Sequence, residues 1–103
     1  MSVIEVNKSN FEAEVLKSDV PVLADFNASW CGPCRSMKPM LDELAETNPG
    51  YKIVSIDIDE EDELAEDYEV SSIPCLVVFK DGKEINRSVG LIPRDAIAAL
   101  MEG

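Results

Sequence analysis

The chain has 103 residues, enough for one domain with a single core and too few for two. Nine lysine and arginine residues stand against 21 aspartates and glutamates, so the net charge at pH 7 is −12. This charge repels phosphate backbones and anionic membrane surfaces, and no apolar run approaches membrane-spanning length, so we expect neither nucleic acid nor a membrane as a partner.

The first part of the chain predicts a strand, a helix and a second strand. Residues 3–6 are a short strand candidate, and Ser9-Asn10-Phe11-Glu12 has the capping-box pattern of a helix that continues to about residue 17. The apolar side chains of residues 20–27 are too continuous for a strand with one wet face. This second strand is therefore predicted to be central in a sheet.

The middle of the chain predicts a long helix, a third strand and a short acidic helix. A helical apolar stripe runs through residues 34–47, and residues 52–57 form the third strand. The helix over residues 61–68 lies in a run of carboxylates. A solvated acidic face explains this run more simply than a docking surface or a cation site.

The last part of the chain predicts a hairpin and a final helix. Residues 75–80 and 84–89 flank Lys80-Asp81-Gly82-Lys83, whose Asp-Gly pair is typical of a tight turn between antiparallel strands. Pro93 stands at a first-turn position of the last helix. Strands that alternate with helices and end in a hairpin predict an α/β fold with a mixed sheet covered on both faces.

Trp30-Cys31-Gly32-Pro33-Cys34 places two thiols three positions apart where an apolar strand gives way to a helix. Cysteines at positions i and i+3 of a first helical turn lie on one face and can form a disulfide with little backbone movement. Unsatisfied N–H groups and the positive end of the helix dipole would favour the thiolate of Cys31. The segment therefore indicates a reversible dithiol–disulfide pair.

Two structural explanations compete with redox chemistry: half of a zinc site, or a pair of core cysteines. Zinc ordinarily takes four ligands, and this chain has three cysteines and no histidine. We therefore expect no bound metal and favour the redox interpretation.

Six segments, spread over nearly the whole chain, are similar to those of one family. They are Ala24-Asp25-Phe26, residues 30–34, Pro39, Ser72-Ile73-Pro74, Phe79-Lys80-Asp81-Gly82 and Val89-Gly90. In this order and spacing they resemble thioredoxin. The resemblance implies one thioredoxin domain over residues 1–103, with about five strands in a mixed sheet and about four flanking helices. The active site would lie beyond the carboxyl end of the second strand.

Cys31 is the candidate nucleophile, because it lies nearer the loop and precedes the residues whose N–H groups would stabilise a thiolate. Cys34, one turn further into the helix and expected to be more buried, would resolve the mixed disulfide. Gly32 and Pro33 shape the turn and belong to the predicted substrate-binding surface, and the resemblance implies that they favour a reducing potential. Trp30 is expected beside the thiols, as part of that surface or simply as an anchor of the loop.

Asp25 interrupts the apolar central strand. Burial of an unpaired carboxylate is unfavourable, so we expect a raised pKa. The resemblance implies that Asp25 exchanges a proton with Cys34 during resolution. The alternative is a structural aspartate that caps a turn or binds the backbone.

Ile73-Pro74 resembles the cis-proline loop that packs opposite the cysteines in the family. A cis bond there would expose the preceding backbone to pair with an extended substrate segment. Gly90, together with Trp30 and Ile73, would line the docking surface, although a glycine at this place can also mark a β-bulge.

Three positions depart from the family pattern. Asn27 stands where many relatives have an aromatic residue, and Ser55 where many have a lysine, which removes one charge partner for Asp25. Cys75 follows Pro74 where threonine is common. We expect Cys75 to be a free, slowly reacting core thiol rather than a third redox cysteine.

The resemblance implies an enzyme, a thiol–disulfide oxidoreductase that reduces protein disulfides and serves electron transport and cell redox homeostasis. Its partners would be oxidised client proteins and a thioredoxin reductase that uses NADPH or another donor, and no cofactor would be bound. Two alternatives are a glutaredoxin-like reductase recharged by glutathione, and a thioredoxin-fold binding subunit whose dithiol controls assembly. An N-terminal stretch without export-signal features favours the cytoplasm, and we expect a monomer.

Overall fold

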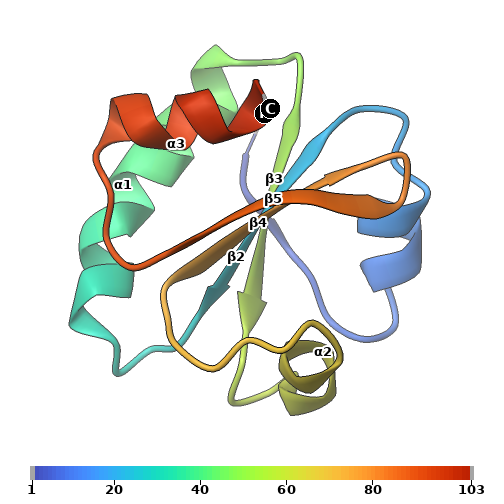
Figure 1. The fold of residues 1–103 in the computed structure, drawn as a ribbon, viewed down its shortest axis with the longest axis vertical. Coiled ribbons are helices and arrows are strands. Elements are labelled where there is room, and N and C mark those ends of the chain that lie inside the picture. The colour runs from blue at the N-terminus through green and yellow to red at the C-terminus, as the bar shows by residue number, and fades with distance from the viewer. Residues whose placement is uncertain (1, 103) are drawn as a thin grey trace.

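The computed structural model describes residues 2–102, which form a mixed five-stranded sheet with helices on both faces (Figure 1). The elements in chain order are β1 (Ile4–Glu5), η1 (Glu12–Leu16), β2 (Val22–Asn27), α1 (Gly32–Thr47), β3 (Lys52–Asp57), α2 (Asp62–Asp67), β4 (Cys75–Lys80), β5 (Lys83–Val89) and α3 (Arg94–Met101). The strand order across the sheet is β1-β3-β2-β4-β5. β1, β3 and β2 are parallel, whereas β4 is antiparallel to both β2 and β5. The predicted mixed sheet is confirmed.

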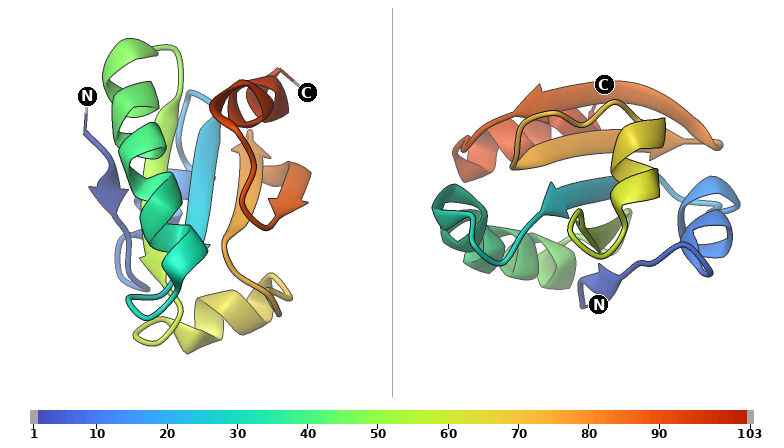
Figure 2. Two further views of the ribbon diagram at one scale, coloured as in Figure 1. Left: turned by 90° about the vertical axis from the view of Figure 1, so that its left-hand side faces the viewer. Right: turned by 90° about the horizontal axis from the view of Figure 1, so that it is seen from below.

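α1 and α3 cover one face of the sheet, and η1 and α2 cover the other (Figure 2). Successive side chains of β2 alternate between these faces, since Leu23 packs with Met37 and Ile97 while Ala24 packs with Phe11. The same alternation directs Asp25 toward the α1 side. Within residues 2–102, the helices are all too short or too polar to cross a membrane.

The predicted strands agree best with the structure where apolar residues are continuous. β3 and β4 have the predicted bounds, and β2 is buried from Val22 through Phe26, as expected of a central strand. β2 begins at Val22 rather than residue 20, β5 begins at Lys83 rather than residue 84, and β1 contains only two residues. Pro93 is the N-cap of α3 and lies just before its first turn, not within it as predicted.

The first helical segment is not capped by Ser9, as the sequence pattern predicted. Asn7 Oδ1 instead accepts hydrogen bonds from the backbone N–H groups of Ser9 and Asn10, at 2.9 and 3.1 Å, and Asn10 Oδ1 accepts the Asn7 N–H at 2.7 Å. Two asparagines thus form the reciprocal bonds of a capping box around the turn that precedes η1, whose own N-cap residue, Phe11, makes no side-chain cap. The segment ends in a π turn, because the Lys17 N–H donates to the Glu12 carbonyl.

Asp81 and Gly82 form the turn between β4 and β5. Both have positive φ, 53° and 78°, and Lys80 pairs with Lys83 across them. Two successive positive φ values define the tight hairpin turn that the Asp-Gly pair predicted. A Cβ atom on Gly82 would lie 3.1 Å from the Leu16 carbonyl oxygen, so both backbone conformation and space require glycine here.

Substitution of Gly82 with alanine is expected to lower the free energy of unfolding by about 1–2 kcal/mol, because a side chain is unfavourable in the left-handed conformation. Gly50→Ala is the matched control, since a Cβ atom there would meet nothing within 4 Å. That substitution should leave stability unchanged or raise it by up to about 1 kcal/mol. Urea denaturation of the oxidised protein measures both, and equal effects would contradict the prediction.

Candidate active site

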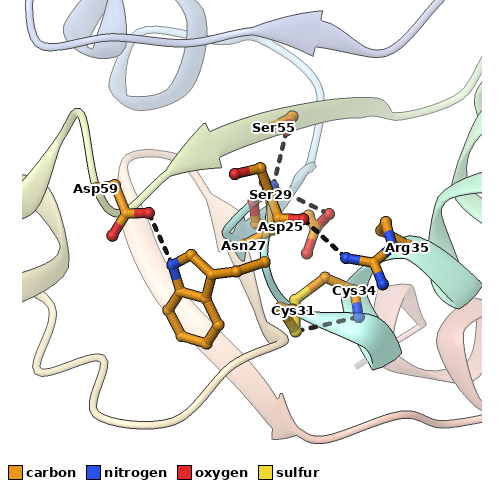
Figure 3. Close-up of a disulfide and its surroundings, with 9 residues drawn as sticks. Asp25, Asn27, Ser29, Cys31, Cys34, Arg35, Ser55 and Asp59 are labelled. Carbon is orange, nitrogen blue, oxygen red and sulfur yellow. Dashed lines mark hydrogen bonds between the residues drawn. A yellow bond between two sulfur atoms is a disulfide. The ribbon is translucent and has the colours of Figure 1, made fainter.

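The cysteine segment lies where β2 ends and α1 begins (Figure 3). Cys31 and Cys34 are joined by a disulfide, and their Cα atoms are 5.2 Å apart. Cys31 is the N-cap of α1, and its Sγ accepts a hydrogen bond from the Cys34 backbone N–H at 3.2 Å. An N-cap acceptor ordinarily binds the second or third N–H of the helix, and Pro33 has no N–H at the second position. The Cys34 N–H is therefore the donor for the Cys31 sulfur.

The surroundings of the two cysteines are apolar. Both pack with Ala28, and the side chains of Ile58 and Ile73 border them. Cys31 is 5% exposed and Cys34 4%, so the predicted difference in burial amounts to one percentage point. Their positions distinguish them more clearly, because Cys31 caps the helix and Cys34 lies within its first turn. The helix itself begins at Gly32, before the predicted residue 34.

The Ile73–Pro74 peptide bond is cis, as predicted. β4 begins directly after Pro74, and Cys75 pairs with Phe26 of β2. Because β4 is antiparallel to β2, its first residues lie at the end of the sheet from which α1 departs. This pairing brings the cis-proline loop to the dithiol, where Ile73 packs beside the cysteines.

Gly90 lies next to this loop. Its backbone N–H donates to the Pro74 carbonyl oxygen at 2.8 Å, and its φ is 97°. The register irregularity between β4 and β5 lies at Val78/Phe79, so Gly90 is not a bulge residue. The side chains on either side of Gly90, Val89 and Leu91, are 56% and 52% exposed. The sequence indicated Val89 only as part of the Val89-Gly90 segment and did not indicate Leu91, because exposed apolar side chains form no periodic pattern.

Within residues 2–102, Trp30 is the most exposed large apolar side chain, at 64%. Its indole Nε1–H donates to Asp59 Oδ2 at 2.8 Å. Asp59 lies just after β3, and no sequence pattern distinguishes it from the other carboxylates of the acidic run. The indole is therefore anchored and exposed, which is consistent with a role in a docking surface.

Asp25 is 6% exposed and lies in a cavity of about 290 Å³ whose lining includes Cys34. Burial raises its pKa from 3.8 to about 7, against a hydrogen bond from Asn27 that lowers the pKa. Glu5 raises the same pKa and Lys38 lowers it, both by smaller amounts. The predicted burial and the direction of the pKa shift are confirmed.

Asn27 and Ser55, two of the departures from the family pattern, are hydrogen-bonded to each other beside Asp25 (Figure 3). Asn27 Nδ2 donates to Ser55 Oγ at 2.8 Å, to the Asp25 carbonyl oxygen at 2.8 Å and to Asp25 Oδ2 at 3.3 Å. Ser55 is the register partner of Asp25 in β3. The i, i+2 spacing of Asp25 and Asn27 could have indicated that they share a face of the strand, but the contact with Ser55 needs the register between strands.

Cys75 is free and buried, as expected. Its side chain packs with Val77 and Phe79 in the core on the η1 side of the sheet, opposite the face that Asp25 occupies. Burial raises the pKa of its thiol. Its slow reactivity remains a prediction.

Comparison with known proteins gives consistent matches over nearly the whole chain. The Thioredoxin family model matches residues 2–103. A thioredoxin from Chlamydia trachomatis is 48% identical over 96 residues, which cover 93% of this chain and 92% of that protein. Thioredoxin 1 from Nostoc sp. is 43% identical over 99 residues, which cover 95% and 92%. Among solved structures, an asparagine-to-glutamine mutant thioredoxin from Halobacterium salinarum has a TM-score of 0.91 at 37% identity, covering 98% of this chain and 88% of that one.

The raised pKa of Asp25 makes stability depend on pH. The Asp25 carboxyl group keeps its proton up to about pH 7 in the folded protein, whereas in the unfolded chain it releases the proton near pH 3.8. Its contribution to the free energy of unfolding is therefore complete below pH 3.8 and is lost as the pH rises through 7. The full difference corresponds to about 4 kcal/mol as an upper figure. Asp25→Asn should remove this dependence, so the variant should be the more stable protein at pH 8, by a few kcal/mol, and gain much less at pH 4. Urea denaturation of the oxidised proteins across this range tests it, and a constant difference would contradict the burial argument.

Proposed function

Since the chain belongs to the thioredoxin family and is a thiol–disulfide oxidoreductase, we propose that Cys31 attacks client disulfides and that Cys34 resolves the product. The observation that carries this proposal is the disulfide between the N-cap of α1 and its first turn. In the reduced protein, the same Cys34 N–H and the helix N-terminus favour the thiolate of Cys31.

In the first step, the Cys31 thiolate attacks one sulfur of a client disulfide. A mixed disulfide forms between Cys31 and the client, and the other client sulfur leaves as a thiolate. Cys31 is the attacking residue because it is the N-cap of α1 and adjoins the loop, where a second protein can approach.

In the second step, Asp25 accepts the proton of the Cys34 thiol, and the resulting thiolate attacks the Cys31 sulfur. The client leaves as a thiolate, and the Cys31–Cys34 disulfide forms. The client gains two electrons, and its two thiolates take up protons from Asp25 and solvent. Support comes from the cavity that Asp25 and Cys34 share and from the pKa of Asp25 near 7, which lets the group accept and return a proton at neutral pH.

An extended client segment would pair with the backbone before Pro74, beside an apolar rim. The rim consists of Trp30, Ile73, Val89, Gly90 and Leu91, with Gly32 and Pro33 next to the sulfur. Oxidised proteins are the substrates that fit such a surface. We further propose a monomer of the cytoplasm that binds no cofactor and is reduced by an NADPH-dependent thioredoxin reductase.

Cysteine variants test the assignment of the two thiols. Cys31→Ser should reduce disulfide reduction to background, whereas Cys34→Ser should keep the attacking thiol and accumulate a mixed disulfide with the client. Mass spectrometry of each variant with an oxidised client protein, under non-reducing conditions, measures the adduct. If the Cys31→Ser variant instead accumulated a mixed disulfide on Cys34, in the amount expected for the Cys34→Ser variant, the assignment would be reversed.

The electron donor is tested by insulin-disulfide reduction with NADPH consumption as the readout. Turnover is expected with thioredoxin reductase and not with glutathione and glutathione reductase. Activity with glutathione alone would favour the glutaredoxin-like alternative. No turnover with either, together with dithiol-dependent binding of a partner, would favour a binding subunit.

A further inference from the structure

We propose that Asn27, held by Ser55, is a positioning residue that orients the Asp25 carboxyl group and stabilises its ionised form through Oδ2, leaving Oδ1 to exchange the proton. The inference rests on the proposed role of Asp25 in resolution. It assigns a joint role to two of the three positions at which this chain departs from the family pattern.

The contacts of the Asn27 amide support this assignment. Its Nδ2 group has two hydrogens and three acceptors, of which Ser55 Oγ and the Asp25 carbonyl oxygen are at 2.8 Å and Asp25 Oδ2 is at 3.3 Å. With fewer hydrogens than acceptors, Asp25 Oδ2 shares a hydrogen with one of the two closer acceptors. An ionised carboxylate attracts that hydrogen more strongly than a neutral carboxyl group does, so the contact favours the charged form.

Ser55 fixes the amide from the neighbouring strand. It is the register partner of Asp25, and its Oγ lies within hydrogen-bond distance of Asn27 Nδ2 (Figure 3). The bond to the Asp25 carbonyl oxygen anchors the same amide on its own strand. Two anchors to different strands restrict the rotation of the Asn27 side chain and keep it beside Oδ2.

The two oxygens of Asp25 thereby become different. Oδ2 accepts from Asn27, whereas Oδ1 is buried and has no hydrogen-bond partner within residues 2–102. Asp25 lines the same cavity as Cys34. Oδ1 is consequently the oxygen available to a proton that moves between the carboxyl group and the thiol of Cys34.

Charged neighbours do not replace the amide. The register partners of Asp25 in β3 and β4, Ser55 and Leu76, do not titrate. The titratable and charged groups that line the cavity come from β1 and α1; they are Glu5, Cys34, Arg35, Lys38 and Asp42. Of the groups that act on the pKa of Asp25, Asn27 lowers it most, ahead of Lys38, while Glu5 raises it.

Two substitutions of Asn27 separate the lost hydrogen bond from altered solvation. Asn27→Ala removes the donor and admits water, which by itself would lower the pKa of Asp25, whereas Asn27→Leu removes the donor and excludes water. The proposal predicts a higher pKa in both variants, by about half a pH unit or more, a roughly threefold change in proton affinity. NMR titration of the labelled Asp25 carboxyl group measures it, and the pH profile of mixed-disulfide resolution should move to higher pH by the same amount.

Ser55→Ala tests whether Ser55 acts through Asn27. A smaller rise in the pKa of Asp25 is expected, and the double variant Asn27→Ala/Ser55→Ala should match Asn27→Ala alone. Asn86→Ala is the matched control, because Asn86 is also a strand residue and its amide donates to a backbone carbonyl, that of Leu100. It should leave the pKa of Asp25 and the pH profile unchanged, whatever its effect on stability.

An unchanged or lower pKa in Asn27→Ala and Asn27→Leu would overturn the proposal. A Ser55→Ala shift that persists in full on the Asn27→Ala background would overturn the role of Ser55 as an anchor. The proposed function fails separately: if Asp25→Asn resolves mixed disulfides at the wild-type rate, Asp25 is not the proton acceptor, and the pKa measurements still decide whether Asn27 stabilises the carboxylate.

Discussion

Asp25 lies in β2, between β3 and β4 and beneath α1, where a carboxylate is poorly solvated. Burial of this group opposes folding whenever the carboxyl group must ionise. An apolar residue at this position would serve the core better, as Leu23 and Leu76 do on the same face. The strand is therefore less stable at the point where the proposed mechanism needs a proton acceptor, a trade-off that is common at active sites.

The topology of the sheet then decides which groups meet Asp25 and the dithiol. β3 is parallel to β2, so Ser55 and, beyond the strand, Asp59 lie at the same end of the sheet as the carboxyl end of β2. β4 is antiparallel to β2, so the cis-proline loop that precedes β4 lies at this end of the sheet as well. If β4 were parallel to β2, its start would lie at the opposite end of the sheet, away from the cysteines. The antiparallel pairing of β4 with β2 thus brings Pro74 to the cysteines, and the hairpin returns the chain to the same end of the sheet at Gly90.

The sequence was most informative where structure depends on neighbours in the chain. Continuous apolar residues defined β3 and β4, and Asp81-Gly82 defined the hairpin turn. The capping residue near the first helical segment was predicted wrongly, because several side chains there can cap, and Asn7 rather than Ser9 accepts the backbone N–H groups. β1 is short because its length is set by pairing with β3 alone.

The same distinction applies to the site. Cys31 and Cys34 lie within one helical turn, and Asp25 interrupts an apolar strand, so local patterns identified them. The bonds of Asn27 to Ser55 and of Trp30 to Asp59 join residues 28 and 29 positions apart. A pairing register and a loop conformation create those contacts, and neither is visible in the order of residues. Asn27 and Ser55 therefore appeared as two separate departures, although in the fold they form one feature.

In the proposed reaction, uncharged hydrogen-bond donors stabilise both anions, the Cys31 thiolate and the Asp25 carboxylate. The Cys34 N–H donates to the Cys31 sulfur, and the Asn27 amide donates to Asp25 Oδ2. Each donor lies two or three positions from its acceptor, so the chain itself fixes the distance. Exposed cations would be screened by salt, and the one that favours the Asp25 carboxylate, Lys38, is opposed by Glu5. In a chain with a net charge of −12, burial thus has the largest effect on the proton affinity of Asp25, the hydrogen bond from Asn27 opposes it, and the charged neighbours contribute less.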